Sequence, residues 1–267
     1  MTLIAAWAGL DCKKDGNKVS SIYFASDSRF SWETDNSSLK YDEGIKVFCS
    51  LKYPYLFGYC GDVLFPVHSI ERILYKIDCD LFFNTEACSF TNKMQVICKE
   101  IETSIRLYPF HSVSFSIIFA SRESYYDFHV GLITYCNETI QAKELPIPSA
   151  SNLIFVGGSG KDSFNKIVCN QKKNPNDGTS RFYYQCLSRA IKDYECPTVG
   201  GVPQLVGIFR KGAGIVFGVI EENSHFVLGK RVDYSPKCLH IQWRNSNFEI
   251  VNPETMKLQE GAQAQPF

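Results

Sequence analysis

The sequence predicts an α+β fold in which antiparallel sheets carry pairs of helices on their outer faces. Strand and helix patterns occur in blocks, in the order strands, two helices, strands, two helices, strands, without the βαβ alternation of a parallel sheet. With 267 residues, 45% of them hydrophobic, the chain is long enough to enclose one large core. We therefore expect one domain over residues 2–235, followed by a C-terminal extension over 236–267 with short strands and a polar tail.

Four strands are predicted before the first helix. Runs rich in β-branched, aromatic and other apolar residues lie at 2–10, 19–26, 45–51 and 53–61. The polar, Gly-containing segment between the first two runs makes them a hairpin. The stretch RFSWETDNSSLKYDEG, between the second and third runs, is mostly polar and is interpreted as a connection.

Two pairs of amphipathic helices are predicted from apolar residues spaced at i, i+3, i+4 and i+7. They cover residues 63–77, 91–108, 161–171 and 180–194. Further strands are predicted between and after the two pairs, at 112–120, 125–135, 139–145, 151–158, 204–211, 214–220 and 225–232.

Charge and cysteine content argue against several classes of protein. Lys and Arg number 28, and Asp and Glu also number 28, so no net charge draws the chain toward nucleic acid or an anionic membrane. No apolar run approaches the roughly 18 residues of a membrane span. The 11 cysteines are scattered without a CxxC pair, and no leader pattern precedes the first strand. Reduced thiols and a cytoplasmic location are therefore expected.

No cofactor and no metal is predicted. The stretch FVGGSGKDS follows a strand as a phosphate-binding loop does, but Phe155 stands where that loop needs Gly, and Asp162 where it needs Ser or Thr. The five His residues lie apart and form neither an HExxH motif nor a Cys-His pair.

The second residue, Thr2, is the first candidate for catalysis. If Met1 is removed, the chain begins with a free α-amine on the residue that carries a hydroxyl. An α-amine has a pKa of about 7.7 to 8.0, so it can accept the hydroxyl proton at cellular pH. Nucleophile and base then belong to one residue. Many chains begin Met-Thr for no catalytic reason, so the dipeptide alone does not decide the matter.

Five further stretches favour the catalytic interpretation. They are FASDSRFSW, IKVF, LFGYCGD, GGSG and VGGVPQLVGIF, in this order along the chain. With Thr2 ahead of them, the chain resembles the proteasome β-subunit and HslV family of N-terminal nucleophile hydrolases over roughly residues 2–232. The resemblance implies a four-layer αββα sandwich of two antiparallel sheets with helix pairs outside. It also implies a threonine-type peptidase that forms an acyl-enzyme.

The resemblance implies a role for each matched residue. Thr2 is the nucleophile, and Lys46 is a buried cation that favours its alkoxide and lowers the pKa of the amine. Asp27 keeps Lys46 charged and oriented. The N–H of Gly61 faces the scissile carbonyl, and Ser159 relays the amine proton. Taken singly, each residue also has an ordinary structural explanation, such as a surface ion pair or a glycine before a helix.

The resemblance also implies how a substrate binds. An extended peptide would add as a strand between Phe30-Ser31 and the segment 61–63. The pocket beside the scissile bond would be shaped by Phe30, Gly44, Tyr59 and Val63. Because Phe30 and Tyr59 are large, this pocket is expected to take small or narrow side chains.

One motif departs from the family. Cys196 and Val199 stand where catalytic proteasome subunits carry the Asp and Ser of Asp-x-x-Ser, and Thr198 or Glu195 replaces them only out of register. Two alternatives therefore stay open, an inactive scaffold subunit and a hydrolase of small amides. By analogy with the family, the expected partners are a polypeptide substrate, further copies in a homo-oligomeric ring, and an ATPase unfoldase.

Overall fold

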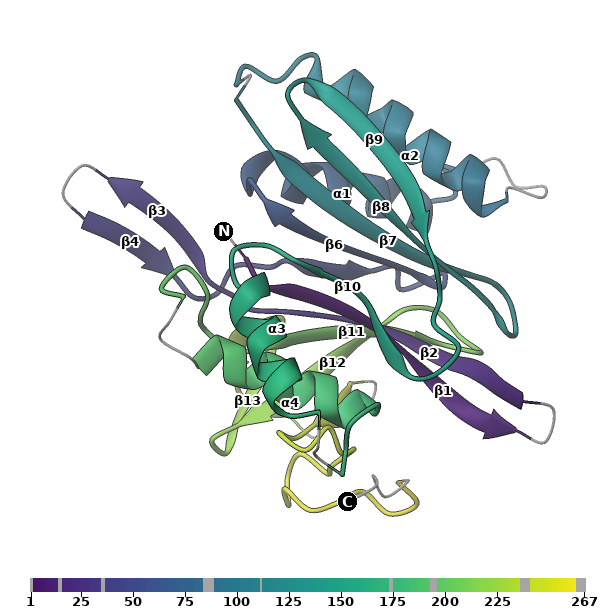
Figure 1. Ribbon diagram of the computed structural model, residues 1–267, viewed down its shortest axis with the longest axis vertical. Helices are drawn as coiled ribbons and strands as arrows, with labels where there is room; N and C mark the ends of the chain where they lie inside the picture. Colours follow the sequence, from purple (N-terminus) through teal and green to yellow (C-terminus); the bar gives the residue numbers. More distant parts are fainter. Residues whose placement is uncertain are drawn as a thin grey trace.

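The computed structural model describes residues 2–13, 16–34, 37–83, 89–110, 112–172, 175–192, 196–235 and 241–262 (Figure 1). Met1 and residues 236–240 and 263–267 of the predicted C-terminal extension lie outside this range. The helices are α1 (Leu64–Asp78), α2 (Phe90–Ile105), α3 (Lys161–Asn170) and α4 (Ser180–Lys192). All four helices occur where the apolar spacing predicted them.

The strands form three separate sheets. The largest has eight strands, β10 (Asn152–Gly157), β1 (Ile4–Lys13), β2 (Gly16–Ser26), β11 (Gln204–Phe209), β12 (Ile215–Glu221), β13 (Ser224–Val227), β14 (Lys230–Val232) and β15 (Gln242–Arg244). The second has five, β5 (Val47–Cys49), β6 (Tyr55–Gly61), β7 (Phe115–Ser124), β8 (Asp127–Cys136) and β9 (Thr139–Leu145). The third is a hairpin of β3 (Phe30–Thr34) and β4 (Ser37–Tyr41).

The predicted fold, a four-layer αββα sandwich of two antiparallel sheets with helix pairs outside, is wrong. The chain is mostly β, about 40% strand and 23% helix, and its strands make three separate sheets. The eight-stranded sheet also contains a parallel pair, β12 with β15. The prediction failed because it counted the hairpin at 30–41, which forms the third sheet, as a connection, and because it left the short strands of the C-terminal extension outside the two sheets, whereas the strand at 242–244 joins the eight-stranded sheet.

The β3–β4 hairpin shows why the polar stretch was misread. Phe30 pairs with Tyr41 and Trp32 pairs with Leu39, so four apolar side chains share one face of the hairpin. The intervening polar residues hide this alternation in the sequence. The hairpin projects from the rest of the molecule, and Trp32, Leu39 and Tyr41 are each about half exposed (Figure 1).

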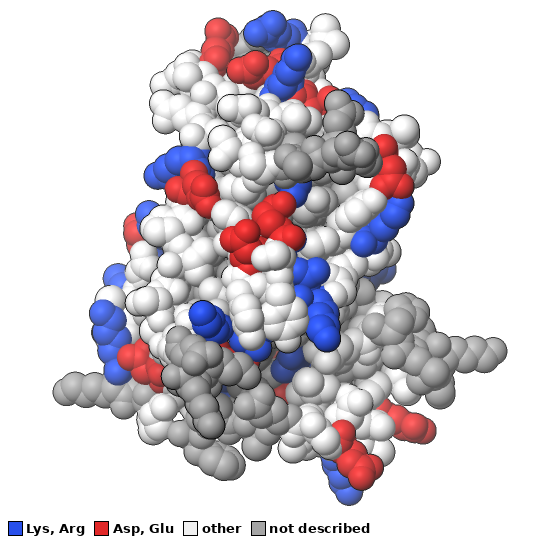
Figure 2. All heavy atoms as spheres, turned by 90° about the vertical axis from the view of Figure 1, so that its right-hand side faces the viewer, with Lys and Arg blue, Asp and Glu red and all other residues white. Residues whose placement is uncertain are grey.

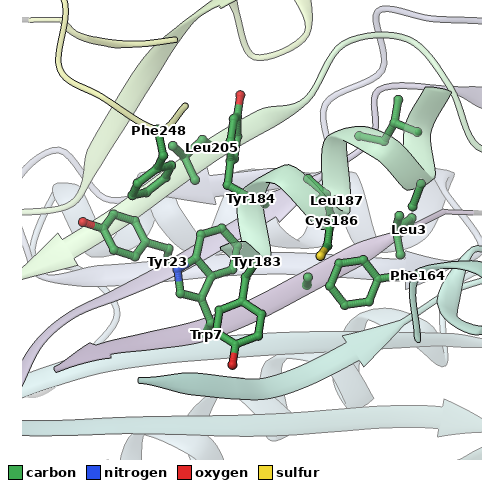
Figure 3. Close-up of a cluster of buried hydrophobic side chains, with 14 of the residues drawn as sticks. Leu3, Trp7, Tyr23, Phe164, Tyr183, Tyr184, Cys186, Leu187, Leu205 and Phe248 are labelled. Carbon is green, nitrogen blue, oxygen red and sulfur yellow. The ribbon is translucent and has the colours of Figure 1, made fainter. Parts of the chain in front are cut away.

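Strand β1 lies inside the eight-stranded sheet and is buried on both faces. Leu3, Ala5 and Trp7 belong to the core cluster that includes side chains of α3 and α4 (Figure 3). Ile4 and Ala6, on the opposite face, pack against side chains of β6 and β7 in the five-stranded sheet. A third cluster lies between the five-stranded sheet and α1 and α2. Burial on both faces explains the unbroken apolar run at the start of the chain.

The C-terminal segment joins the same core. β15 pairs with β12, and Phe248 is almost fully buried, with its ring centroid 5.2 Å from that of Tyr23 and 5.3 Å from that of Tyr184. Figure 3 shows these rings beside Trp7. Residues 241–251 therefore complete the large sheet and its aromatic cluster.

The surface carries both signs of charge. On the face that bears the β1–β2 hairpin, basic and acidic side chains are interspersed (Figure 2). None of the described helices is long and apolar enough to cross a membrane.

Candidate active site

Three strand ends meet where Thr2 lies. Ile4 of β1 pairs with Ser26 at the end of β2 and with Gly157 at the end of β10. Thr2 precedes this row by two residues, Asp27 follows Ser26, and Ser159 follows Gly157 by two residues. The antiparallel register therefore places three of the predicted catalytic residues close together, just beyond the ends of neighbouring strands.

The backbone of Thr2 is held by the loop between β10 and α3. The Thr2 carbonyl accepts a hydrogen bond from the N–H of Gly160 at 3.2 Å. Gly158 has a φ of +89°, and a Cβ on it would stand 1.9 Å from the Thr2 carbonyl oxygen. This position requires glycine both for its conformation and for its close approach to Thr2. The Thr2 N–H donates to Ser159 Oγ at 3.3 Å.

Asp27 and Lys46 form a fully buried ion pair beside Thr2. Lys46 Nζ donates to Asp27 Oδ1 at 2.7 Å, and neither side chain is exposed. The same oxygen accepts the N–H of Leu3 at 2.8 Å, while Oδ2 accepts the N–H groups of Arg29 at 3.1 Å and Gly200 at 3.2 Å. These donors satisfy the carboxylate and set its orientation, as a buried charge requires.

The ammonium of Lys46 lies close to the Thr2–Leu3 peptide. Lys46 Nζ and the Leu3 nitrogen both contact Asp27 Oδ1, at 2.7 and 2.8 Å, so they are no more than 5.5 Å apart. Lys46 Nζ also donates to the Arg29 carbonyl at 2.5 Å. Burial lowers the pKa of Lys46 below its ordinary value, and the charge of Asp27 opposes this shift.

Thr198, whose position in the sequence does not match the Asp-x-x-Ser motif, places its hydroxyl beside Ser159. Thr198 Oγ1 is 2.8 Å from Ser159 Oγ and 3.3 Å from Cys196 Sγ. Val199 is buried in the core cluster with α3 and α4, so it takes no part in this polar group. Glu195, the other alternative, lies outside the described residues. In the sequence, the only indication of a role for Thr198 was a hydroxyl in the segment before Gly200-Gly201. Its spacing did not match the Ser of the Asp-x-x-Ser motif, which argued against that role.

Arg29 connects the Asp27 segment to the loop that carries Thr198. Its guanidinium makes two hydrogen bonds to Asp42, at 2.6 and 2.7 Å, and donates to the carbonyls of Pro197 and Val199 at 3.2 Å. A Cβ on Gly200 would stand 2.3 Å from the Arg29 guanidinium carbon. A side chain at position 200 would therefore displace the guanidinium of Arg29, which packs on this backbone. A cavity of about 480 Å³ opens beside Arg29, Cys196 and Gly200.

Gly61 ends β6, and its contacts give a structural reason for glycine. Its φ is +99°, and a Cβ would stand 2.4 Å from the Ser114 carbonyl oxygen. The preceding residue, Cys60, is buried, and its sulfur is 2.9 Å from the position of a Cβ on Gly157. The end of β6 thus approaches the end of β10. Burial raises the pKa of Cys60 to about 11, so its side chain is a thiol at neutral pH.

Of the four residues predicted to shape the substrate pocket, Phe30 and Gly44 are in direct contact. Phe30 and Val63 pack against the cluster that contains Tyr59. Gly44 lies beneath the Phe30 ring, since a Cβ there would stand 2.4 Å from ring atoms. Lys46 Nζ is 5.7 Å from the centroid of the same ring. The ring of Phe30 therefore links the predicted pocket to the ion pair.

Tyr59, the remaining pocket residue, and Ser31, which was predicted to bind the substrate strand, are placed differently. Tyr59 is fully buried, and its hydroxyl donates to the Ile45 carbonyl at 3.2 Å. Burial raises the pKa of Tyr59. Ser31 is partly buried, and its Oγ has no hydrogen-bond partner among the described residues. Tyr59 is therefore part of the core cluster against which Phe30 packs, while Ser31 lies in β3 next to Phe30.

Comparison with known proteins does not assign a family. No family model matches the chain, and no curated protein is significantly similar to it.

Proposed function

We propose that this protein is a threonine-type hydrolase that cleaves peptide bonds through an acyl-enzyme on Thr2, after Met1 has been removed. The observation that carries the proposal is the buried Lys46–Asp27 pair, which contacts the residue next to Thr2 while Ser159 Oγ accepts from the Thr2 nitrogen. A buried cation beside a hydroxyl at the start of the chain has a chemical use, because it stabilises the alkoxide as it forms.

In the proposed reaction, the free α-amine of Thr2 accepts the proton of its own hydroxyl. Thr2 Oγ1 attacks the scissile carbonyl carbon, the C–N bond breaks, and the leaving amine takes the proton. Water then hydrolyses the Thr2 ester and regenerates the hydroxyl. Lys46 stabilises the developing negative charge, and Asp27 keeps Lys46 protonated and in place. In this proposal the N–H of Gly61 donates a hydrogen bond to the oxyanion that forms from the scissile carbonyl oxygen.

Thr198 extends the proposed proton path. In this structure Thr2 N is a peptide nitrogen, and hydrolysis of the Met1–Thr2 bond turns it into an amine next to Ser159 Oγ. Because Ser159 Oγ also contacts Thr198 Oγ1, the two hydroxyls form a short chain that orients the amine and relays its proton. This chain supplies hydroxyls where the Asp and Ser of Asp-x-x-Ser are missing.

The test is the intact mass of the purified protein before and after exposure to a peptide epoxyketone, which needs the hydroxyl and the free amine of one terminal residue. We expect loss of Met1 and a single adduct. Thr2→Ala should abolish the adduct, and the matched variant Thr2→Ser should keep it. Retained Met1 or an adduct that persists in Thr2→Ala contradicts the proposal.

A small amide remains the second candidate substrate, and an inactive scaffold the third. The cavity beside Arg29 favours neither a peptide nor a small amide by its size alone. Assays with a peptide library and with small acyl amides separate the first two. Loss of Met1 without any adduct, together with no turnover in either assay, indicates the scaffold.

The proposed partners are a polypeptide substrate, further copies of this chain in a ring, and an ATPase unfoldase. The half-exposed Trp32, Leu39 and Tyr41 on the projecting hairpin support self-association. Light scattering after gel filtration tests it, and a monomer at micromolar concentration contradicts it. The proposed location is the cytoplasm, supported by the free thiols of the eight cysteines that the structure describes in full.

A further inference from the structure

A second cavity lies at the far end of the eight-stranded sheet. Its volume is about 820 Å³, and it is bounded by the outer halves of β1 and β2, the start of α4 and the segment 242–250. Along β1 it is roughly 25 Å from Thr2, at about 3.3 Å per residue. This size is within the usual range for a small-molecule site. The cavity is therefore distinct from the proposed active site.

Arg244 lines this cavity and carries a buried charge. Its side chain is 95% buried, since the residue is only 5% exposed. It donates to the Phe248 carbonyl at 2.8 Å and to Gln242 Oε1 at 3.1 Å, both uncharged acceptors. Among the described residues, its Nε has no hydrogen-bond partner and no carboxylate makes an ion pair with the guanidinium.

A buried cation without a counter-ion is costly. The nearby acids are engaged elsewhere, because Glu249 pairs with Arg181 and Asp11 pairs with Arg210, each at 2.8 Å. The rings of Phe248 and Phe217 lie 4.7 and 5.4 Å from the guanidinium carbon and offset part of the cost. No carboxylate among the described residues balances the positive charge itself.

Other features at the cavity add positive potential. Arg210 and Lys211 line it together with Arg244, and Asp11 is the only carboxylate among the lining residues that the structure describes. The cavity thus has three cations against one anion, a surplus of two charges. The first turn of α4 also opens on it, with Thr179 accepting the Phe182 N–H at 3.2 Å as the cap, and this helix end favours an anion.

The walls also offer apolar surface. The ring of Phe209 and the side chain of Ile250 line the cavity, and Tyr125 stands at its edge with its ring 5.9 Å from Lys211 Nζ. Tyr23 and Phe248 form the inner wall, and Figure 3 shows the Tyr23 hydroxyl pointing away from the aromatic cluster. A ligand here can place a charged group by the cations and an apolar group against the rings.

We propose that this cavity binds a small molecule that carries a phosphate group and an aromatic or apolar portion, with Arg244 and Lys211 supplying its counter-charges. A phosphate dianion matches the surplus of two positive charges, whereas a carboxylate neutralises only one. The inference is independent of the chemistry at Thr2.

The test uses phenyl phosphate as the probe and isothermal titration calorimetry with the full-length protein. We expect one site with a Kd on the order of 0.1 to 1 mM, as the probe's small size allows. Inorganic phosphate should bind more weakly and phenol should not bind measurably. No saturable binding of phenyl phosphate at concentrations roughly tenfold above this range overturns the proposal.

Two variants locate the site. Arg244→Met should weaken phenyl phosphate binding by about 10- to 100-fold, the usual effect of a hydrogen-bonded charge. If that variant does not fold, Lys211→Met, at an exposed position, should weaken binding by roughly 3- to 10-fold and reduce its dependence on salt.

Arg189→Met is the matched control, since it removes one exposed positive charge from the last turn of α4, away from the cavity. It should bind phenyl phosphate like the unaltered protein, and so should Thr2→Ala. Equal weakening by Arg189→Met, or binding that survives both Arg244→Met and Lys211→Met, shows that the probe binds elsewhere or only through net charge.

Discussion

The two ends of the eight-stranded sheet each bury a cation, and they differ in what neutralises it. At one end, Lys46 has the carboxylate of Asp27 at 2.7 Å, and that carboxylate also accepts three backbone N–H groups. At the other end, Arg244 has only uncharged acceptors and two aromatic rings. The first charge is compensated within the chain. The second has no counter-charge among the described residues, and in our proposal a ligand supplies it.

The comparison separates two uses of a buried cation. A compensated cation keeps a fixed position and charge, which suits a group that stabilises a reaction intermediate. An uncompensated cation costs stability in the ligand-free protein and recovers that cost on binding an anion. Substitution, pH and ligand should therefore affect the two ends in different ways.

The largest expected difference is in the free energy of unfolding. Lys46→Met leaves Asp27 as a buried charge without its ion-pair partner, so it should destabilise the protein by about 3–5 kcal/mol and abolish turnover. Arg244→Met removes a charge that has no counter-charge among the described residues, so it should leave the stability of the ligand-free protein unchanged or raise it by about 1 kcal/mol. Urea unfolding measures both.

Adding phenyl phosphate sharpens this comparison. It should raise the unfolding midpoint of the unaltered protein and of Lys46→Met, but not that of Arg244→Met. If Arg244→Met is as destabilising as Lys46→Met, then the aromatic rings alone compensate Arg244, and the contrast between the two ends fails.

The pH dependence of turnover should distinguish loss of charge on Lys46 from unfolding. Turnover should first rise with pH as the Thr2 amine becomes neutral. It should then decrease as Lys46 loses its proton, and this decrease should begin before pH 10.5, because burial lowers the pKa of Lys46 from that value. In the same alkaline window the unfolded chain binds more protons than the native protein at this residue, so the contribution of Lys46 to stability increases with pH. Activity and unfolding free energy, measured together from pH 6 to 10.5, test this. A rate that follows the unfolding free energy downward contradicts it.

A smaller effect is expected at the hydroxyl chain. Thr198→Val removes the hydroxyl next to Ser159 at nearly constant volume and should lower turnover by roughly tenfold, within the range for one hydrogen bond in a polar network. Thr198→Ser should restore most of the rate. The acid limb of the pH profile should shift as well, because the hydroxyl acts on the amine through Ser159. An unchanged pH profile with a lower rate would indicate a purely structural role.

The helices could be predicted from the sequence because their signal is local. Apolar residues at helical spacing have to face one side of a helix wherever it packs, so all four segments were found within a few residues of their observed bounds. The sheets were harder to predict from the sequence, because strand pairing depends on segments that are far apart in the chain. The hairpin at 30–41 has apolar residues diluted by polar ones, so its pattern did not predict strands. Short strands were expected in the C-terminal extension, but nothing in their sequence indicated that β15 pairs with β12.

The site residues show the same division. Thr2, Asp27 and Ser159 were proposed from short motifs, and the register of β1 with β2 and β10 brings them together at the same end of these strands. Thr198 was set aside because its spacing before Gly200 did not fit, but the loop held by Arg29 places its hydroxyl next to Ser159. Spacing along a loop does not determine where a side chain points.

By itself, the sequence determined the helices, the long apolar strands and the residue types that make a nucleophile, a cation and a carboxylate available. These depend on local periodicity and chemical identity. Only the tertiary structure decided that Asp27 neutralises Lys46 while Arg244 is buried among uncharged acceptors, that the hairpin forms a third sheet, and that Phe248 completes the core. Each of these depends on contacts between segments far apart in the chain, and it is these contacts that set the burial and the counter-charge of a side chain.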